Sequence, residues 1–477
     1  MSRPVPPYYY QTLDWNRLVA DYPPAPSYFD TVWKWPRERL VALQQQRLHE
    51  ALQRAWQTPF YRRRWEKAGV RPDDVRTLAD LPKLPFYTVD DIRDSIALDP
   101  PYGDYQGRAA AAAAEEPLRI FWSGGTTGDP RPTVYTQWDR EAGAILTQRM
   151  YYLQGVRPGD VVMNSWAFST HNGAWIYDHA LHHWLGCLNI TTGTGNVTAT
   201  EKQLMFAHKY GVTTILSWAD HLVYMANLAK ELGYDLERDF KIRTLPTFGN
   251  PLPVTEAWGR PAYEAYGFHE VQLVSAECEA RSGLHVFEDA FIVECVDVET
   301  GQPVPDGQTG NLVVTCLYKT GNQHIRYNIQ DLSRIVSREP CACGGTHLRT
   351  DRFLGRSDTM VKLRGINIWP EACGGVVNKD PRVTGEWFCT AETKQTPRGA
   401  VDEMTIMVEH KPEVGDPEAL RAHLEDRLKV EIGLRINVQV VGPDALRSLT
   451  GLGTDRPKPK RFEDRRIAQK QDRPPEL

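Results

Sequence analysis

The stretch Phe121-Trp-Ser-Gly-Gly-Thr-Thr-Gly-Asp-Pro-Arg-Pro-Thr133 decides how the rest of the chain is interpreted. Three glycines within five positions let the backbone approach an anion, and one serine and two threonines add hydroxyl donors beside the cation Arg131. Strand-like apolar runs lie on both sides, at 118–122 and 134–136. No Gly-Lys-Ser/Thr opens a helix here, which argues against a Walker loop. We predict a phosphate-binding loop between two hairpin strands; by itself, the motif also fits an ordinary surface turn.

Length and composition limit the protein classes that fit. A chain of 477 residues predicts roughly two or three domains. It is 41% hydrophobic and 25% charged, as in soluble globular proteins, and no apolar run approaches the ~20 residues that a membrane helix needs. The N-terminal residues lack a signal-peptide core, so we expect a cytoplasmic protein. The formal charge of -5 provides no general basic surface. We therefore expect neither a nucleic acid nor a membrane as partner.

The apolar pattern changes along the chain. Residues 1–35, rich in proline and aromatics, predict an extended surface arm, and 37–68 predict two amphipathic helices. After the loop, helices alternate with short strands, which favours an α/β domain with a largely parallel sheet. The helices are expected at 139–154, 175–185, 200–210 and 219–232, and the strands at 160–164, 188–192, 213–217, 272–275, 291–298 and 311–317.

From about residue 355 the pattern predicts a smaller domain. Strands at 361–368, 386–392, 404–409 and 436–441, with a helix at 418–430 and a short one after the first strand, give a β-α-β-β-α-β order. We therefore predict an α/β protein: a large N-terminal domain, residues 1–354, with mixed and parallel sheets, and a small ferredoxin-like α+β lid, residues 355–477.

Five motifs, in the same order, resemble those of the adenylate-forming superfamily. They are Gly124-Gly-Thr-Thr-Gly128, Tyr266-Gly-Phe-His-Glu270, Ile325-Arg-Tyr-Asn-Ile-Gln-Asp331, Gly355-Arg-Ser-Asp358 and Pro457-Lys-Pro-Lys-Arg461. Three further phrases resemble the phenylacetate-CoA ligase branch: Pro59-Phe-Tyr-Arg-Arg63, Gly283-Leu-His-Val-Phe-Glu-Asp289 and Arg364-Gly-Ile-Asn-Ile-Trp-Pro370. The resemblance covers about residues 37 to 466.

This resemblance implies an AMP-forming acid-CoA ligase that activates an aromatic or arylacetic acid as an acyl-adenylate and then forms the CoA thioester. ATP, Mg²⁺ and coenzyme A would be required, and a homodimer is the common assembly. Two alternatives stay open: transfer of the activated group to an amine or a carrier protein, or a non-catalytic nucleotide-binding relative.

The chemistry brings two anions together, so the site must supply cations and hydrogen-bond donors. The resemblance implies that Lys458, Glu270 and Arg356 are catalytic, with Glu270 holding Mg²⁺, and that Asp358 is the hinge of the lid. Lys460 competes with Lys458, because Pro457 stands where the family usually has glycine. Taken singly, each residue also fits a solvated or capping role. The predicted ATP-binding residues are Ser123, Gly124, Gly125, Thr126, Thr127, Gly128, Arg131, Gly249, Tyr266, Gly267, Asp331 and Lys460.

Two further sites are predicted. Cys341 and Cys343 form a Cys-x-Cys pair, and some phenylacetate-CoA ligases carry a structural zinc, which implies Cys278 and His285 as the other ligands. His347 and Cys316 are rival ligands, and a set of buried thiols is the alternative. The acid pocket is assigned to aromatic side chains that could equally be core residues: Trp122, Phe168, His171, Trp175 and Phe268. His269 is expected to line this pocket and not to act as a catalyst.

Overall fold

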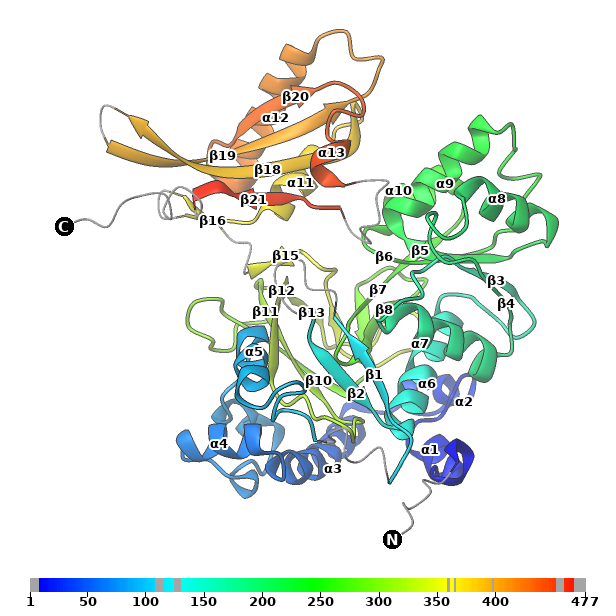
Figure 1. Cartoon of the computed structure of the whole chain (residues 1–477), viewed down its shortest axis with the longest axis vertical. Coiled ribbons are helices and arrows are strands. Elements are labelled where there is room, and N and C mark those ends of the chain that lie inside the picture. Colours follow the sequence, from blue (N-terminus) through cyan, green and yellow to red (C-terminus); the bar gives the residue numbers. More distant parts are fainter. Residues whose placement is uncertain are drawn as a thin grey trace. The chain divides into compact units, whose positions relative to one another are not determined.

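The structure is a computed structural model that describes residues 8–107, 115–123, 130–357, 361–363, 366–396, 399–451 and 459–466. Contacts divide the chain into two units (Figure 1). The large unit comprises Met1–Ile329 and Ser333–Phe353, and the small unit comprises Gln330–Leu332 and Leu354–Leu477. Within the described ranges, no helix combines the length and the apolar character that crossing a membrane requires.

The helices of the large unit begin in the N-terminal region and then alternate with strands. They are α1 (Trp15–Asp21), α2 (Ser27–Asp30), α3 (Arg37–Trp56), α4 (Pro59–Lys67), α5 (Val89–Leu98), α6 (Gln137–Leu153), α7 (Gly173–His179), α8 (Thr200–Lys209), α9 (Ala219–Glu231) and α10 (Pro251–Trp258). A π-helix, η6 (Ala180–Leu185), continues α7, and short 3-10 turns cover Tyr9–Gln11, Val32–Lys34, Pro72–Asp74 and Leu78–Lys83.

The strands of this unit form three sheets. They are β1 (Arg119–Trp122), β2 (Pro132–Tyr135), β3 (Val161–Asn164), β4 (Leu188–Thr191), β5 (Thr214–Trp218), β6 (Leu245–Phe248), β7 (Ala262–Phe268), β8 (Gln272–Glu277), β9 (Leu284–Val286), β10 (Phe291–Val296), β11 (Gly310–Cys316), β12 (Tyr327–Ser333), β13 (Ile335–Ser337) and β14 (Arg349–Thr350). Residues Gln330–Leu332 of β12 belong to the small unit, where Asp331 and Leu332 pair with β15 (Gly355–Arg356).

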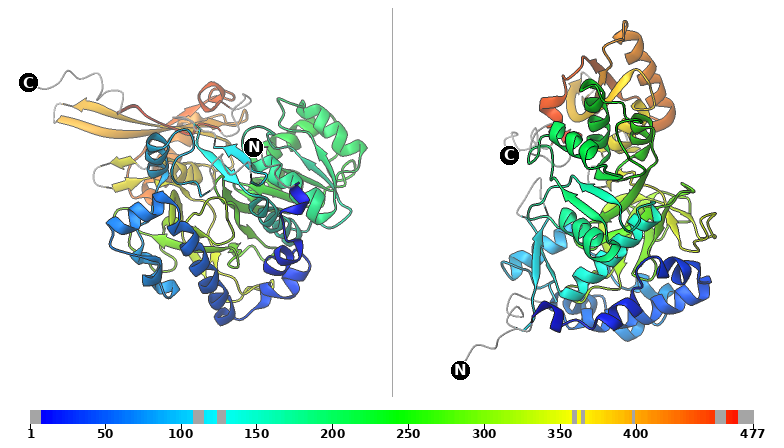
Figure 2. Two further views of the ribbon diagram at one scale, coloured as in Figure 1. Left: turned by 60° about the horizontal axis from the view of Figure 1, so that its bottom comes forward. Right: turned by 90° about the vertical axis from the view of Figure 1, so that its right-hand side faces the viewer.

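The largest sheet has nine strands in the order β13-β14-β9-β8-β7-β6-β5-β3-β4. The β4-β3-β5-β6-β7 half is parallel and the other half antiparallel. Side chains alternate across the parallel half: Val162 and Leu216 pack with α6 and α7, whereas Met163 and Ile215 pack with α8 to α10. Figures 1 and 2 show these helix groups on opposite faces of the sheet. The predicted α/β class with mixed sheets is confirmed.

The predicted hairpin around the opening motif is also confirmed. Strands β1 and β2 pair antiparallel, with Trp122 opposite Pro132. Helix α6 follows directly, because the Thr136 side chain accepts a hydrogen bond from the Asp139 N–H and caps the first turn. The loop itself, residues 124–129, lies outside the described residues.

One prediction for the large unit was wrong. Residues 8–35 are not an extended surface arm, because α1, α2 and a 3-10 turn bury Leu18, Tyr28 and Trp33 in the main core. Helix α10, which Asn250 caps, and strand β7 were not predicted. Burial against distant residues overrides the local pattern of the N-terminal segment.

The small unit packs helices against a sheet of order β20-β19-β18-β21, in which β18 pairs antiparallel with β19 and the outer strands are parallel to their neighbours. The predicted element order needs correction. Residues 361–368 form a separate antiparallel hairpin, and the fourth strand of the sheet is β21. The elements are β16 (Val361–Leu363), β17 (Ile366–Ile368), α11 (Pro370–Val377), β18 (Val383–Thr396), β19 (Gly399–His410), α12 (Pro417–Ile432), β20 (Asn437–Val441), α13 (Arg447–Thr450) and β21 (Phe462–Asp464).

Candidate active site

The turn between β7 and β8 carries the carboxylate at the centre of the site. A Cβ atom at Gly267 would lie 2.1 Å from the backbone oxygen of Gln272, so this close crossing of two strands requires glycine. Tyr266, one residue earlier, is buried on the same strand. The register of the two strands shifts between Tyr266 and Gly267. This shift and the turn present Glu270 just beyond the end of β7.

Glu270 is buried and held by groups from two other segments. Its Oε1 lies 3.3 Å from Nη2 of Arg131 and accepts a hydrogen bond of 3.4 Å from the Tyr327 hydroxyl. The side chain of Glu270 is only 3% exposed. The structure therefore brings together the predicted loop cation and the predicted magnesium ligand, and it adds a tyrosine from the Ile325–Asp331 motif.

Lys319 is a site residue that the sequence did not reveal. Its Nζ donates a 2.8 Å hydrogen bond to the backbone oxygen of Glu270 and lies 3.9 Å from the centre of the Tyr135 ring. The Tyr135 hydroxyl in turn donates to the backbone oxygen of His269. Burial lowers the pKa of Lys319 to about 8, against the opposing effect of Asp139. The side chains of Lys319 and Tyr135 thus hold the backbone of the turn at Glu270 and His269.

Ser123 and Arg131 close the base of the phosphate loop. The Ser123 N–H donates to the Arg131 backbone oxygen at 3.0 Å, and the Arg131 N–H donates to the Ser123 hydroxyl at 3.4 Å. The predicted loop residues Gly124, Gly125, Thr126, Thr127 and Gly128 lie outside the described residues. Gly249, at the end of β6, has a φ of +96°, a conformation that favours glycine.

In the small unit, the predicted ATP-binding residue Asp331 and the predicted catalytic residue Arg356 form an ion pair. Asp331 Oδ1 lies 3.1 Å from Arg356 Nη1, and the two residues face each other across β12 and β15. Lys460 forms a 2.9 Å ion pair with Glu463 in the same unit. Asp358 and Lys458 lie outside the part of the chain that the structure describes.

Four of the five predicted acid-pocket residues lie on adjoining segments. Phe168 and Trp175 form an edge-to-face pair with ring centres 5.2 Å apart. Trp122 is joined to this segment because its backbone N–H donates to the Thr170 backbone oxygen at 3.0 Å. The ring of His171, on the same segment, lies 5.0 Å from that of His269. The aromatic segment 168–175 thus adjoins the turn that carries Glu270.

Phe268 belongs to a different aromatic group. Its ring packs 5.7 Å from that of Tyr327 and 6.2 Å from that of Tyr266. Because Tyr327 also donates to Glu270, Phe268 lies near the carboxylate. The sequence could not assign these positions, since each aromatic residue also fits a core role.

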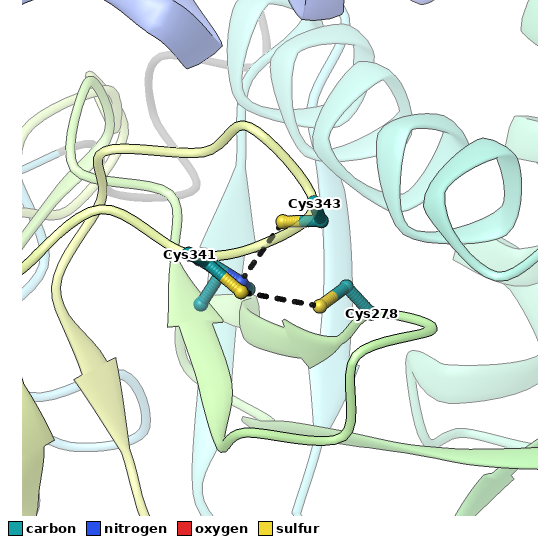
Figure 3. A group of neighbouring side chains, drawn as sticks. Cys278, Cys341 and Cys343 are labelled. Atoms are coloured by element: carbon teal, nitrogen blue, oxygen red, sulfur yellow. Dashed lines mark hydrogen bonds between the residues drawn. The ribbon is translucent and has the colours of Figure 1, made fainter.

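The four predicted zinc ligands form one cluster. The ligand atoms of Cys278, His285, Cys341 and Cys343 lie within 4.8 Å of one another (Figure 3 shows the three thiols converging). The Sγ atoms of Cys278 and Cys341 are 3.8 Å apart, and Cys343 Sγ is 3.5 Å from His285 Nε2. With metal–ligand distances of about 2.3 Å to sulfur and 2.0 Å to nitrogen, a tetrahedral zinc site requires separations of about 3.8 and 3.5 Å. The donor set therefore fits zinc.

The rival ligands lie elsewhere. His347 is engaged by the backbone oxygens of Val286 and Val32, and Cys316 is a buried strand residue opposite Phe291. The turn that presents the Cys-x-Cys pair is fixed by a hydrogen bond from Cys341 N–H to the Gly345 backbone oxygen.

Comparison with protein families agrees with this architecture. The family model of the AMP-binding enzymes matches residues 49–316, and that of the AMP-binding enzyme C-terminal domain matches residues 365–466. The chain therefore belongs to the AMP-binding enzyme family.

Individual relatives define the activity. The chain is 31% identical to a phenylacetate-coenzyme A ligase of Aromatoleum evansii, over 93% of this chain and 98% of that protein. It is 30% identical to the Thermus thermophilus phenylacetate-coenzyme A ligase, over 86% of this chain and 94% of that protein. A 2-hydroxyisobutyryl-CoA ligase structure with bound 2-HIB-AMP matches with a TM-score of 0.81 and 25% identity, covering 94% of this chain and 95% of that one. The predicted branch and activity are confirmed: the chain is an AMP-forming acid-CoA ligase of the phenylacetate-CoA ligase type, which uses ATP and coenzyme A and works through an acyl-adenylate.

Proposed function

We propose that the acid is an aromatic or arylacetic acid. The observation that carries this proposal is the contact between His171 and His269, because it joins the aromatic segment 168–175 to the turn that holds Glu270. A flat apolar acid would pack against Phe168 and Trp175 while its carboxylate reaches the reaction centre. The relatives named phenylacetate-coenzyme A ligase support the same class.

The roles of the described residues follow from charge. Attack of the acid carboxylate on the α-phosphate requires compensation of two anions, and Glu270 would hold Mg²⁺, which supplies charge neutralisation at the phosphates when bound. Arg131, at the loop base, is a cation 3.3 Å from Glu270 that can turn towards a phosphate. Asp331 would accept the ribose hydroxyls, and its pairing with Arg356 holds the carboxylate in place meanwhile.

The small unit is proposed to act as a mobile lid. Rotation about Asp358 would bring Lys458 over the forming acyl-phosphate bond in one state and admit the CoA thiol in the other. Lys460 is the less favoured candidate for the catalytic lysine, because it already pairs with Glu463. A Lys458→Ala variant should lose adenylation, whereas Lys460→Ala should retain most of it.

Acid-dependent ATP–pyrophosphate exchange tests this function. The panel comprises benzoate, phenylacetate, their hydroxylated forms, short-chain acids and 2-hydroxyisobutyrate, the acid that matches the structural relative. We expect exchange with aromatic or arylacetic acids and thioester formation only when CoA is present. AMP release driven by an amine or a carrier protein in place of CoA would move the assignment to a different acceptor.

We also propose that the cysteine and histidine cluster binds one structural zinc. Four protein ligands leave no open position, so the metal would link the loop of Cys341 and Cys343 to the β8–β9 region. Metal analysis should find about one equivalent, and Cys341→Ser should lose metal and thermal stability. Cys295→Ser, a buried thiol outside the cluster, is the control. Protein made with ample zinc but isolated without metal would overturn this assignment.

A further inference from the structure

Arg140, on α6, is a mostly buried arginine without a carboxylate partner among the described residues. A guanidinium carries five N–H donors, and the one described acceptor for this side chain is Asn172 Oδ1, 2.9 Å from Nη1. The carbon atom Cζ of Arg140 lies 5.2 Å from the centre of the Phe121 ring. Burying a charge without a counter-charge is costly, so buried charges in proteins are normally paired. A cation kept in this state indicates a site for an anion.

The two carboxylates next to Arg140 in the sequence are engaged by other donors. Asp139 accepts hydrogen bonds from the N–H and the hydroxyl of Thr320, at 2.6 and 3.0 Å. The Glu141 carboxylate is held by three donors: the Tyr9 hydroxyl, the His179 ring and the Trp184 indole N–H. Neighbouring acidic residues therefore do not replace the missing partner of Arg140.

A second arginine lies beside the same aromatic ring. Cζ of Arg119 is 5.0 Å from the centre of the Phe121 ring and 5.1 Å from that of Trp175. Arg119 is exposed and, within the described ranges, also has no ion pair. The pKa of Arg140 is lowered by burial and also by Arg119, against the effects of Tyr9, Tyr135 and Glu141. An anion bound by both arginines would offset their mutual repulsion.

The two arginines contact the aromatic segment 168–175 at some distance from the phosphate loop. Arg140 contacts this segment through Asn172, and Arg119 contacts it through Trp175. Arg119 begins β1, four positions before Ser123 at the loop base. A strand rises about 3.3 Å per residue, so the Cα atoms of Arg119 and Ser123 are about 13 Å apart. The anion site is therefore separate from the phosphates and from the carboxyl that reacts with them.

We propose that Arg119 and Arg140 bind a second anionic group of the acid substrate, a carboxylate or a sulfonate remote from the reacting carboxyl. A guanidinium pairs with such oxyanions through parallel N–H bonds. This inference rests on the acid-activating function proposed above and narrows its substrate class to acids with a second negative charge. A phosphate of coenzyme A is the other source of negative charge, but the contacts of both arginines with segment 168–175 favour the acid.

ATP–pyrophosphate exchange tests this inference with pairs of acids that differ in charge but little in shape. Para-sulfobenzoate is compared with para-sulfamoylbenzoate, para-carboxyphenylacetate with para-carbamoylphenylacetate, and succinate with succinamate. The meta isomers of the aromatic acids cover the other ring position, and the assay contains no coenzyme A. In each pair that reacts, kcat/KM should favour the charged acid by about tenfold or more, because the neutral amide forfeits the charge-assisted hydrogen bonds.

Two arginine variants carry the second comparison. Arg140→Met removes the buried charge and leaves a side chain that suits an apolar position. Arg119→Gln removes the exposed charge, where the risk to folding is smallest. Each variant should reduce the preference for the charged acid to about threefold or less, and Arg140→Lys should retain part of it because the charge is kept. An unchanged preference in Arg119→Gln and in Arg140→Met would overturn the inference.

Arg39→Gln is the control variant. Arg39, on α3, is exposed, and its Cζ lies 3.6 Å from the centre of the Trp35 ring, so the substitution also removes an arginine from an aromatic ring. The preference for the charged acid should be unchanged in this variant. A reduction as large as that in Arg119→Gln would show that the overall charge of the protein sets the preference, and would overturn the inference.

Coenzyme A and dephospho-coenzyme A separate the two sources of negative charge. Thioester formation with each thiol is measured in the wild type and in Arg119→Gln. We expect the ratio of the two rates to be the same in both proteins. A reduced preference for coenzyme A in the variant, with an unchanged preference among the acids, would assign the arginine to a phosphate of coenzyme A and overturn the inference.

The outcomes also separate this inference from the proposed function. Equal rates for the charged and neutral members of the aromatic pairs would overturn the anion site and leave the aromatic assignment standing. A preference for succinate over succinamate, with no exchange on any aromatic acid, would support the anion site and overturn the aromatic assignment. Equal exchange with succinate and succinamate and none with the aromatic acids, or no exchange with any acid of the panel, would overturn both.

Discussion

Two arginine–carboxylate ion pairs in the large unit differ in burial and in the number of contacts that hold the carboxylate. Arg149 and Asp289 are both fully buried, and Arg149 Nη1 donates to the two carboxylate oxygens at 3.1 and 2.9 Å. Arg131 and Glu270 make a single contact of 3.3 Å, and Arg131 is 15% exposed. The first pair holds both oxygens of its carboxylate, and the second leaves room for another partner.

The neighbours of the two pairs extend this contrast. The Arg149 guanidinium also lies 3.7 Å from the centre of the Tyr28 ring, and its Nε donates to the Pro23 backbone oxygen. Each arginine keeps one buried nitrogen without a partner among the described residues, Arg149 Nη2 and Arg131 Nε. The pairs therefore differ in how the carboxylate is held: two contacts in a fully buried pair indicate a structural role, whereas a single contact with a partly exposed arginine leaves the carboxylate able to take a ligand.

Arg149→Met should produce the largest loss of stability. It leaves the Asp289 carboxylate buried without a counter-charge, which costs about 3 to 5 kcal/mol. Urea unfolding followed by circular dichroism measures the loss. Arg338→Met, which removes an exposed ion pair with Asp306, is the control and should change the free energy of unfolding by less than about 1 kcal/mol. Equal effects of the two variants would contradict the structural role.

Glu270→Gln should affect chemistry instead. The amide keeps the size of the side chain but loses the charge that would hold Mg²⁺, so acid-dependent pyrophosphate exchange should fall by about 100-fold or more. The loss of stability should be smaller than that of Arg149→Met, because Glu270 makes fewer contacts. Exchange within a few fold of wild type, over a range of Mg²⁺ concentrations, would remove Glu270 from the reaction centre.

Lys319→Met should weaken the site without touching the substrates. Losing the support of the Glu270 backbone should lower exchange by about 10- to 100-fold, in the range seen for groups that orient metal ligands. An unchanged exchange rate would show that the turn holds its position without this lysine.

The lowered pKa of Lys319 also determines how the free energy of unfolding changes with pH. The folded pKa of about 8 lies below the ordinary value, so between these values the unfolded chain binds more protons than the folded one. Lys319 therefore makes stability rise with pH from about 8 towards the unfolded pKa near 10.4. Urea unfolding at several pH values should show this rise in the wild type, and Lys319→Met should lack it.

Local patterns in the sequence were enough to predict the framework that carries these pairs. The β1–β2 hairpin and the alternation from α6 to α9 follow from periodicity within short windows. The N-terminal helices were missed, because Tyr28 and Trp33 are ordered by packing against Phe287 and His347, more than 250 residues away. The small-unit sheet was misassigned for the same reason: β21 is three residues long and is defined by its pairing with β18.

The candidate site likewise contains residues that local sequence could predict and residues that it could not. Glu270 was singled out because it belongs to a motif of five consecutive residues, and the cluster of Cys278, His285, Cys341 and Cys343 because the Cys-x-Cys pair and the resemblance point to these residues. Lys319 could not, since a single lysine after a strand carries no local signal and its contact depends on a backbone oxygen 49 positions earlier. The opening motif predicts a phosphate-binding loop, whereas the contacts of Lys319 and Tyr135 with the neighbouring turn arise only from tertiary folding.

Replacing Arg149 or Arg131 by lysine tests the difference between the two ion pairs with the smallest expected effects. Lysine keeps the charge but cannot reproduce a two-point contact with a carboxylate. Arg149→Lys should still cost about 1 to 3 kcal/mol of stability, because the two bonds to Asp289 and the contact with the Tyr28 ring are disturbed. Arg131→Lys should change exchange by less than about threefold, since its one contact with Glu270 needs only a positive charge. A large loss of exchange in Arg131→Lys would show that Arg131 makes a two-point contact with a phosphate during the reaction, and the two pairs would then differ in partner and not in geometry.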